Sequence, residues 1–352
     1  MRRVTTFAAA LLTGALALTA CGGSSTSQTS PADSSSGSSS APAKSKLKVG
    51  LAYDIGGRGD QSFNDSAAAG LDKAKADLGI EAKEAEASAG EADSAKEERL
   101  RALAGAGFNP VIAVGFAYSG AVAKVAKENP DIHFAIIDDA NAAGPNITNL
   151  LFAENQGSFL VGAAAALKST KKNIGFIGGV DVPLIHKFQA GYEAGAKAVD
   201  PSIKIQSKYL TQPPDFSGFG APDKGKTAAA GMYDAGADVV FAAAGGSGAG
   251  VFEAAKTAGT KAIGVDSDQY KTADPAVRSV ILTSMLKKVD VAVFDFIKSA
   301  TEGTYTPGPR IYDLKANGVD YSTSGGQVDD IKDKLDAFKQ KIISGEITVP
   351  EK

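Results

Sequence analysis

The chain has 352 residues, 43% apolar and 22% charged, an ordinary globular balance with enough length for two domains. A formal net charge of −3 argues against a nucleic-acid partner, because phosphate binding needs a basic surface. One cysteine and two histidines exclude internal disulfides, Fe–S clusters and thiolate zinc sites, and leave little for proton-transfer chemistry. This composition disfavours an enzyme, and we expect no catalytic residues, no metal and no cofactor.

Residues 1–21 predict an export signal with a lipid-attachment site. Arg2 and Arg3 form a basic start, and residues 7–18 form an apolar stretch too short for a stable membrane span. The following LTAC motif, which ends at Cys21, is similar to the bacterial lipobox, in which the cysteine is acylated (palmitate) and becomes the N-terminus. The alternative is an ordinary secretory signal with an incidental cysteine. Because the chain has one cysteine, we favour lipid anchoring at the extracytoplasmic face of a bacterial cell membrane.

Residues 22–46 are rich in Ser, Gly, Ala and Pro, with eleven serines and almost no large apolar side chain. Such a segment buries too little surface to offset the entropy of ordering, so we expect a disordered tether. By the scaling of Gly/Ser linkers it would span about 25–30 Å.

Strands and helices alternate in the first part of the folded region. We expect strands at 47–53, 80–86, 111–114 and 134–137, and helices at 64–78, 92–106 and 118–128. Continuous apolar runs such as Val111–Val114 are typical of parallel strands covered on both faces. This order predicts an α/β fold with a doubly wound sheet.

The same alternation restarts at Asn173, which predicts a second lobe of the same kind. We expect strands at 174–177, 203–210, 239–242 and 262–265, and helices at 187–199, 221–235 and 248–258. A strand at 279–283 and a helix at 285–300 are then expected to cross to the first lobe, residues 303–314 to return, and 327–343 to form an amphipathic helix. The predicted domains are 47–155 with 280–303 for lobe 1, and 156–279 with 304–352 for lobe 2.

Certain polar and aromatic residues recur in both halves. The predicted pairs are Asp54 and Asp181 after a first strand, Phe63 and Phe188 at a helix start, and Asp138 and Asp266 at the end of a late strand. Loops at the carboxyl ends of parallel strands line the ligand crevice of such sheets. We therefore expect these residues along one cleft between the lobes.

Five sequence blocks carry a resemblance to a known family. They are VGLAYDIGGRGDQSFNDSAAAGLDKA (49–74), GFIGGVDVPLIHKFQAGYEAGAK (175–197), AAGGSGAGVFEAAK (243–256), AIGVDSDQ (262–269) and ILTSMLKKVDVAVFD (281–295). In this order they resemble the basic membrane protein family, bacterial lipoproteins that serve as substrate-binding components of ABC importers, typically for purine nucleosides. The resemblance covers about residues 47–314. It implies two Rossmann-like lobes with three hinge crossings, as in type I periplasmic binding proteins, and a monomer that delivers its ligand to separate permease and ATPase subunits.

The same resemblance implies a ligand-binding site. Carried over residue by residue, it comprises Asp54, Phe63, Asn64, Asp138, Phe188, Gly245, Gly246, Asp266 and Lys287. The chain departs from the family pattern at His186, where relatives often carry another basic residue, so we assign no role to His186.

A nucleoside has a flat base and a sugar with vicinal hydroxyls. Two phenylalanines would stack on the base, Asp54 and Asn64 would read its edge, and the later aspartates would accept from the ribose hydroxyls. Lys287 would donate to the ligand and offset buried charge, and the glycine pair would let backbone approach the sugar. Each residue also has a purely structural alternative. The phenylalanines would then be core residues, Asn64 would cap a helix, the later aspartates and Lys287 would form surface salt bridges, and the glycine pair would be a simple loop.

Other functions remain open on the sequence alone. The same cleft would suit a sugar-like or ribosylated solute, and a surface sensor or adhesin of the same fold would look alike. A nucleosidase would find carboxylates for acid–base chemistry here but is disfavoured, because the sequence offers no calcium-type aspartate cluster and no catalytic histidine in a nucleophile–base arrangement.

Overall fold

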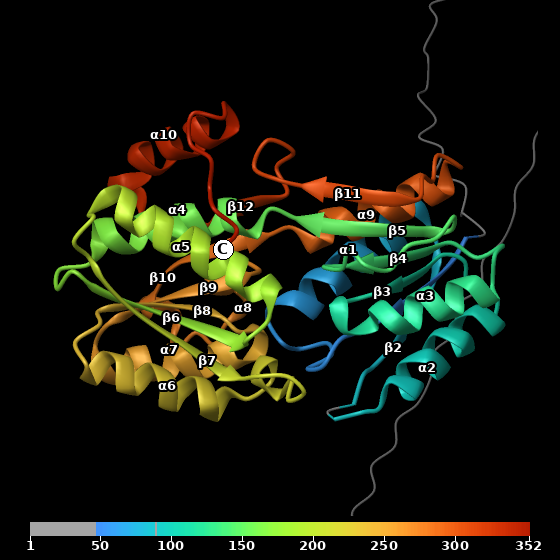
Figure 1. The fold of residues 1–352 in the computed structure, drawn as a ribbon, viewed down its shortest axis with the longest axis horizontal. Coiled ribbons are helices and arrows are strands. Elements are labelled where there is room, and N and C mark those ends of the chain that lie inside the picture. The colour runs from blue at the N-terminus through green and yellow to red at the C-terminus, as the bar shows by residue number, and fades with distance from the viewer. Residues whose placement is uncertain (1–46, 89) are drawn as a thin grey trace, which may run out of the picture. The chain divides into compact units, whose positions relative to one another are not determined.

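A computed structural model describes residues 47–88 and 90–352, which form two six-stranded sheets covered by helices (Figure 1). The predicted signal peptide, Cys21 and the predicted tether lie outside the described residues. None of the helices in residues 47–88 and 90–352 combines the length and the apolar composition of a membrane span.

The first sheet has the strand order β11-β5-β4-β3-β1-β2, and all its neighbouring strands are parallel. Its strands are β1 (Lys48–Ala52), β2 (Glu81–Ala85), β3 (Val111–Ala113), β4 (Phe134–Ile137), β5 (Ile147–Phe152) and β11 (Gly308–Tyr312). The helices of this first lobe are α1 (Phe63–Leu78), α2 (Asp93–Gly105), α3 (Ser119–Glu128) and α9 (Val289–Thr301).

The second sheet has the order β12-β10-β9-β8-β6-β7, in which β12 is antiparallel to β10. Its strands are β6 (Asn173–Val180), β7 (Lys204–Thr211), β8 (Val239–Ala243), β9 (Lys261–Asp266), β10 (Ile281–Lys287) and β12 (Val319–Tyr321). The helices of this second lobe are α4 (Glu154–Lys168), α5 (Pro183–Val199), α6 (Pro222–Asp234), α7 (Gly248–Ala258), α8 (Gln269–Thr272) and α10 (Lys332–Ile343).

The two sheets repeat one topology, strand for strand: β2-β1-β3-β4-β5 in the first corresponds to β7-β6-β8-β9-β10 in the second. The prediction of two doubly wound α/β lobes is therefore confirmed. In each sheet the strand order reverses beside the first strand, between β1 and β3 and between β6 and β8. Ligands bind at such switch points in open α/β sheets.

The predicted positions of the late crossings are wrong. β10 pairs with β9 in the second sheet, and β11 pairs with β5 in the first. Residues 281–287 form an almost wholly buried strand, and the short α8 segment before it keeps it next to β9. The chain leaves the second lobe only after Lys287, so the helix expected from Met285 begins at Val289, and β11 joins the first sheet before the chain returns.

Two close helix contacts depend on glycine. A Cβ at Gly70 of α1 would lie 2.4 Å from the carbonyl oxygen of Asp290, which shows how tightly α9 packs on the first lobe. In the second lobe, a Cβ at Gly195 of α5 would lie 1.9 Å from the carbonyl oxygen of Phe159 on α4. These contacts fix α4 and α9, the helices that follow the crossings between lobes after β5 and after β10.

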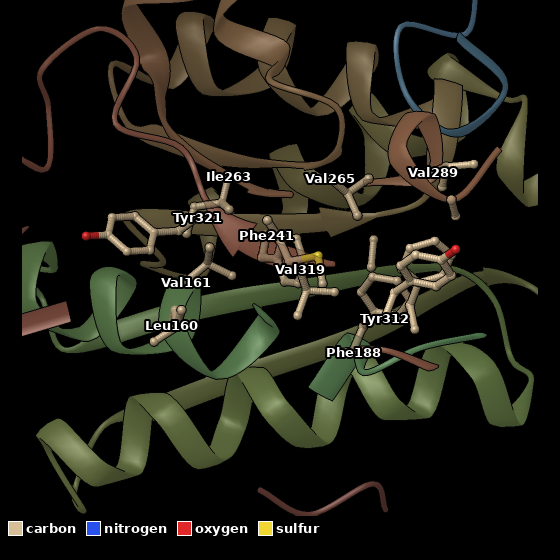
Figure 2. Packing of buried hydrophobic residues seen from close by; sticks show 14 of the residues in the cluster. Leu160, Val161, Phe188, Phe241, Ile263, Val265, Val289, Tyr312, Val319 and Tyr321 are labelled. Carbon is tan, nitrogen blue, oxygen red and sulfur yellow. The ribbon is translucent and has the colours of Figure 1, made fainter. Parts of the chain in front are cut away.

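The main hydrophobic core is continuous across the two lobes. Figure 2 shows its central part, where Val161 of α4 and Tyr321 of β12 lie near Ile263, and Phe188 lies near Tyr312 of β11. Side chains of both sheets belong to this one cluster, including Leu51 of β1 and Phe241 of β8. The packing places the carboxyl ends of β4, β9 and β10 around one space.

Candidate ligand-binding site

A cavity lies between the lobes at the carboxyl ends of the strands, and it contains about 560 Å³ of atom-free space, partly open to solvent. Asp54 and Asp138 follow β1 and β4 of the first sheet, while Asp266 and Lys287 end β9 and β10 of the second.

Eight of the nine predicted ligand residues line this cavity. They are Asp54, Phe63, Asn64, Asp138, Phe188, Gly245, Asp266 and Lys287. Gly246 is not among the lining residues; a Cβ there would lie 3.7 Å from the Cβ of Asp60 on the opposite lobe. This distance is an ordinary van der Waals contact, so the packing at this position does not require glycine.

Asp138 and Asp266 have matching backbone geometry. They end equivalent strands, and both adopt a left-handed conformation, with φ of 65° and 62°. Non-glycine residues rarely adopt such φ values, and they cluster where the surrounding structure holds a functional side chain in place. The repeat thus presents one carboxylate from each lobe to the cavity.

Lys287 is the buried cation of the site, with 1% of its surface exposed. Its ammonium donates to Asp138 and lies 3.3 Å from the Glu154 carboxylate. The rings of Phe63 and Phe188 lie 5.1 and 5.5 Å from the same nitrogen. Burial works against the charged form, but the surrounding carboxylates outweigh it and raise the pKa of Lys287.

The carboxyl groups of the cavity outnumber its cation. Burial raises the pKa of Asp54 to about 7 and that of Asp266 to about 6, and it also raises to about 7 the pKa of Glu154, which lies outside the lining and contacts Lys287. Near neutral pH these groups are therefore only partly ionised. Such a site suits a neutral ligand rich in hydroxyl and N–H donors and disfavours an anionic one.

Asn64 is buried, and both ends of its side-chain amide form hydrogen bonds within the protein. Its Oδ1 accepts from the Asp54 backbone N–H at 3.0 Å, and its Nδ2 donates to Asp60 Oδ2 at 3.1 Å. Asp60 also accepts from the backbone N–H groups of Ser62 and Asn64. This cluster fixes the loop between β1 and α1, which contributes Asp54, Ile55 and Asp60 to the cavity wall.

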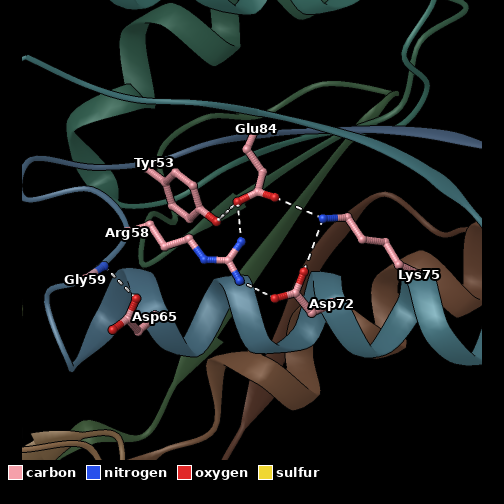
Figure 3. A network of polar contacts seen from close by, with 7 residues as sticks. All are labelled: Tyr53, Arg58, Gly59, Asp65, Asp72, Lys75 and Glu84. Atoms are coloured by element: carbon pink, nitrogen blue, oxygen red, sulfur yellow. Dashed lines mark hydrogen bonds and ion pairs between the residues drawn. The ribbon is translucent and has the colours of Figure 1, made fainter. Parts of the chain in front are cut away.

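The same loop is held from outside by a charged network (Figure 3). Arg58 forms ion pairs with Asp72 of α1 and, at 2.7 Å, with Glu84 of β2. Glu84 also accepts from the Tyr53 hydroxyl at 2.6 Å and from Lys75 at 3.0 Å. The network ties the loop to the first lobe, so Asp54 is presented by a firmly held backbone.

Asp181 does not reach the cavity, contrary to the expectation from the sequence repeat. Asp181 follows β6, which has eight residues, whereas β1 has five. Asp181 therefore lies further from the start of its strand than Asp54 does. Its side chain is 46% exposed and lies 2.7 Å from His186 on α5.

Sequence reasoning missed several lining residues: Ile55, Asp60, Gly115, Phe116, Leu184, Ile185, Phe219, Ala243 and Val265. It also missed Glu154, which contacts Lys287 from the start of α4. One signal was available: Gly115 follows β3 as Gly245 follows β8. A Cβ at Gly115 would lie 2.3 Å from Asp54 Oδ2, so this glycine makes room for that carboxylate.

Comparison with known proteins places this site in a family. Residues 46–352 match the family described as "ABC transporter substrate-binding protein PnrA-like". The chain belongs to this PnrA-like family. The resemblance to basic membrane proteins is thereby confirmed, and the family's proteins are extracytoplasmic solute-binding components of ABC transporters.

Individual relatives cover nearly the whole chain. It is 36% identical to the "CD4+ T-cell-stimulating antigen" of Listeria innocua, over 99% of both chains. It is also 36% identical to the "ABC transporter nucleoside-binding protein BmpA" of Lactococcus lactis, over 88% of this chain and 90% of that protein. Among solved structures, an ABC transporter solute-binding protein of Aeropyrum pernix matches with a TM-score of 0.75 and 30% identity, over 87% of this chain and 94% of that one. The fold is that of type I periplasmic binding proteins, as predicted.

Proposed function

We propose that this PnrA-like protein is the lipid-anchored receptor of an ABC importer, and that it binds purine nucleosides in the cavity between its lobes. The observation that carries this proposal is the placement of Phe63 and Phe188. They come from opposite lobes, line one cavity, and form no ring–ring contact with each other within the described chain. A planar base between them would stack on both faces, and each stack contributes about 1–3 kcal/mol.

The polar groups are distributed as a nucleoside requires. Asp138 Oδ1 is buried and has no hydrogen-bond partner among the described residues, although Oδ2 accepts from Lys287. A ribose hydroxyl would supply the missing donor, and Asp266 offers a second acceptor from the other lobe. We therefore assign Asp138, Asp266 and Lys287 to the sugar, with the backbone at Gly245 beside it.

Asp54 is the group best suited to the base edge. Its Oδ1 accepts the Ile55 N–H at 2.8 Å, and Oδ2 lies against Gly115 at the cavity wall. A ring or amino N–H of a purine would donate to this carboxylate. Asn64 Oδ1 accepts from the backbone N–H of Asp54 and so fixes the position of that residue. We therefore propose an indirect role for Asn64.

The printed name of the Lactococcus relative supports a nucleoside as ligand. The proposed anchor is Cys21, with residues 22–46 as the tether to the membrane surface; both inferences come from the sequence alone. The family relationship implies a permease and an ATPase as transport partners.

The direct test of the ligand is native mass spectrometry of the chain purified with Cys21→Ser, which removes the attachment site. We expect a co-purifying mass that matches a purine nucleoside, and, because the chain has no tryptophan, a purine absorbance spectrum after denaturation. A co-purifying sugar without ultraviolet absorbance would reject the nucleoside in favour of a sugar-like solute.

A further inference from the structure

The loop after β1 bonds directly to the second lobe beside the cavity. The carbonyl oxygen of Gln61 accepts from Gln269 Nε2 at 3.1 Å and from Thr272 Oγ1 at 3.3 Å. The carbonyl oxygen of Ser62 accepts from Ser267 Oγ at 2.8 Å, and Ser62 Oγ donates to Asp266 Oδ2 at 2.6 Å. Ser62 Oγ also lies 3.2 Å from the Val265 carbonyl oxygen, so five hydrogen-bond contacts join two consecutive residues of one lobe to one short segment of the other.

Gln269, one of the donors on the second lobe, is fixed by hydrogen bonds within its own lobe. Gln269 is 1% exposed, its Oε1 accepts from the Val265 N–H at 2.8 Å, and its own N–H donates to Ser284 Oγ at 3.1 Å. These bonds fix the amide so that Nε2 points to the first lobe. A preorganised donor loses little side-chain entropy when the lobes meet.

The acceptors on the first lobe, the backbone carbonyl groups of Gln61 and Ser62, are also held in one conformation. Gln61 has a left-handed φ of 55°, which costs free energy in a residue other than glycine. The loop that carries it is held by Asp60 and by the Arg58 network. The first lobe thus presents the two carbonyl oxygens of Gln61 and Ser62 in a fixed orientation.

We propose that Gln61 and Ser62, with Ser267, Gln269 and Thr272, form a closure latch, which sets the free energy of lobe closure for every ligand alike. None of these five residues lines the cavity, whereas Asp266, which accepts from Ser62, does. The latch therefore acts on the closed state and not on ligand chemistry. This inference rests on the proposed function only for the choice of ligands in its test.

The latch has a definite thermodynamic consequence. Ligand binding and lobe closure are linked, so a weaker closed state lowers the affinity for all ligands by one common factor. A net hydrogen bond corresponds to about a 2- to 10-fold change in an equilibrium constant. By contrast, a residue that contacts the ligand changes the affinity by factors that differ between ligands.

The test uses the double variant Ser267→Ala/Thr272→Val, which removes two donors with little change in volume. Its matched control is Thr257→Val/Ser344→Ala, whose hydroxyls bond only to carbonyl oxygens of their own helical segments. Spin labels at Ala123→Cys on α3 and Ala258→Cys on α7, in the full chain with Cys21→Ser, report the distance between lobes without ligand. Calorimetry with inosine, guanosine and adenosine reports the affinities.

We expect the latch variant to add an open-lobe population to the distance distribution and to weaken every nucleoside about 10-fold, by the same factor, while the control changes neither. Unchanged distances, or losses that differ between nucleosides, would overturn the latch. Gln269→Glu is the second variant: it keeps an acceptor for the Val265 N–H and replaces the donor to Gln61 by a buried carboxylate oxygen that the Gln61 carbonyl oxygen repels, so we expect the same pattern with a larger common loss. If the wild-type chain binds no nucleoside, the proposed function fails, and the distances alone still decide on the latch.

Discussion

The ammonium of Lys287, at the end of β10, donates a hydrogen bond to the carboxylate of Asp138, which follows β4 in the other sheet. Both side chains are almost fully buried. Glu154, at the first crossing between the lobes, lies 3.3 Å from the same ammonium. One cation therefore neutralises acidic groups of both lobes next to the cavity.

Replacing Lys287 by Met should leave these buried carboxylates without a counter-charge. Breaking one side of a buried ion pair costs about 3–5 kcal/mol, so we expect a fall of that size in the free energy of unfolding and a loss of ligand affinity. Urea denaturation measures the first quantity. The control Lys168→Met removes an exposed pair with Asp330 and should cost less than about 1 kcal/mol. Adding Glu154→Gln to Lys287→Met should restore part of the stability; a further loss would contradict this electrostatic reading.

Stability should fall with rising pH because of Asp54. Burial raises the pKa of Asp54 from 3.8 to about 7, so the folded chain binds this proton more tightly than the unfolded chain. The resulting stabilisation, about 4 kcal/mol, is complete below the unfolded pKa and disappears as the pH rises through 7. Asp54→Asn should therefore flatten the dependence of the unfolding free energy on pH between 4 and 7. Asp181→Asn, at an exposed site, serves as the control, and equal slopes in all three proteins would refute the assignment.

The two cavity phenylalanines should contribute comparably to nucleoside affinity. Phe63→Leu and Phe188→Leu keep an apolar side chain but lose the stacking surface, and we expect each to weaken purine nucleosides about 5- to 100-fold. Phe338→Leu is a matched control, since Phe338 lies on α10 and packs on the core outside the cavity. An equal effect of all three substitutions in calorimetry would mean that the cavity pair acts through packing alone.

Asp266→Ala should weaken ribosides far more than free bases, because the carboxylate is assigned to the sugar. Asp266 also accepts from Ser62 across the lobes, so Ser62→Ala provides the comparison that removes this bond, together with the longer contact from Ser62 Oγ to the Val265 carbonyl oxygen, and keeps the carboxylate. The expected result is a common loss for nucleoside and base in Ser62→Ala, and an additional riboside-specific loss in Asp266→Ala. Equal losses of inosine and hypoxanthine in Asp266→Ala would contradict the contact with the sugar.

Local patterns were sufficient to predict most of the elements. Apolar runs at β3, β4, β8 and β9, and helical spacing in α1 and α7, are properties of a few consecutive residues, and the observed elements lie within a few residues of their predicted positions. The assignment of β10 and β11 to sheets failed, because it depends on which neighbour completes the hydrogen bonding. No local pattern specifies that choice.

The site shows the same division. Asp138 and Asp266 directly follow or end strands, and Asp54 lies two residues after β1, so the carboxyl-end rule was enough to bring them together. Asp60 and Glu154 were not predicted. The role of Asp60 depends on how the loop after β1 folds, and that of Glu154 on where the chain crosses between lobes. Asp181 shows the opposite error: a repeat in sequence does not ensure a repeat in space when one strand is longer.

The proposed ligand of the cavity between Phe63 and Phe188 is a purine nucleoside. Isothermal titration of the delipidated, ligand-stripped chain with inosine, guanosine and adenosine measures this binding. Two stacks and several charge-assisted hydrogen bonds, less the cost of ordering, predict a sub-micromolar Kd for at least one of them, beyond roughly −8 kcal/mol. Only millimolar binding to all three would show that the cavity is not a purine nucleoside site.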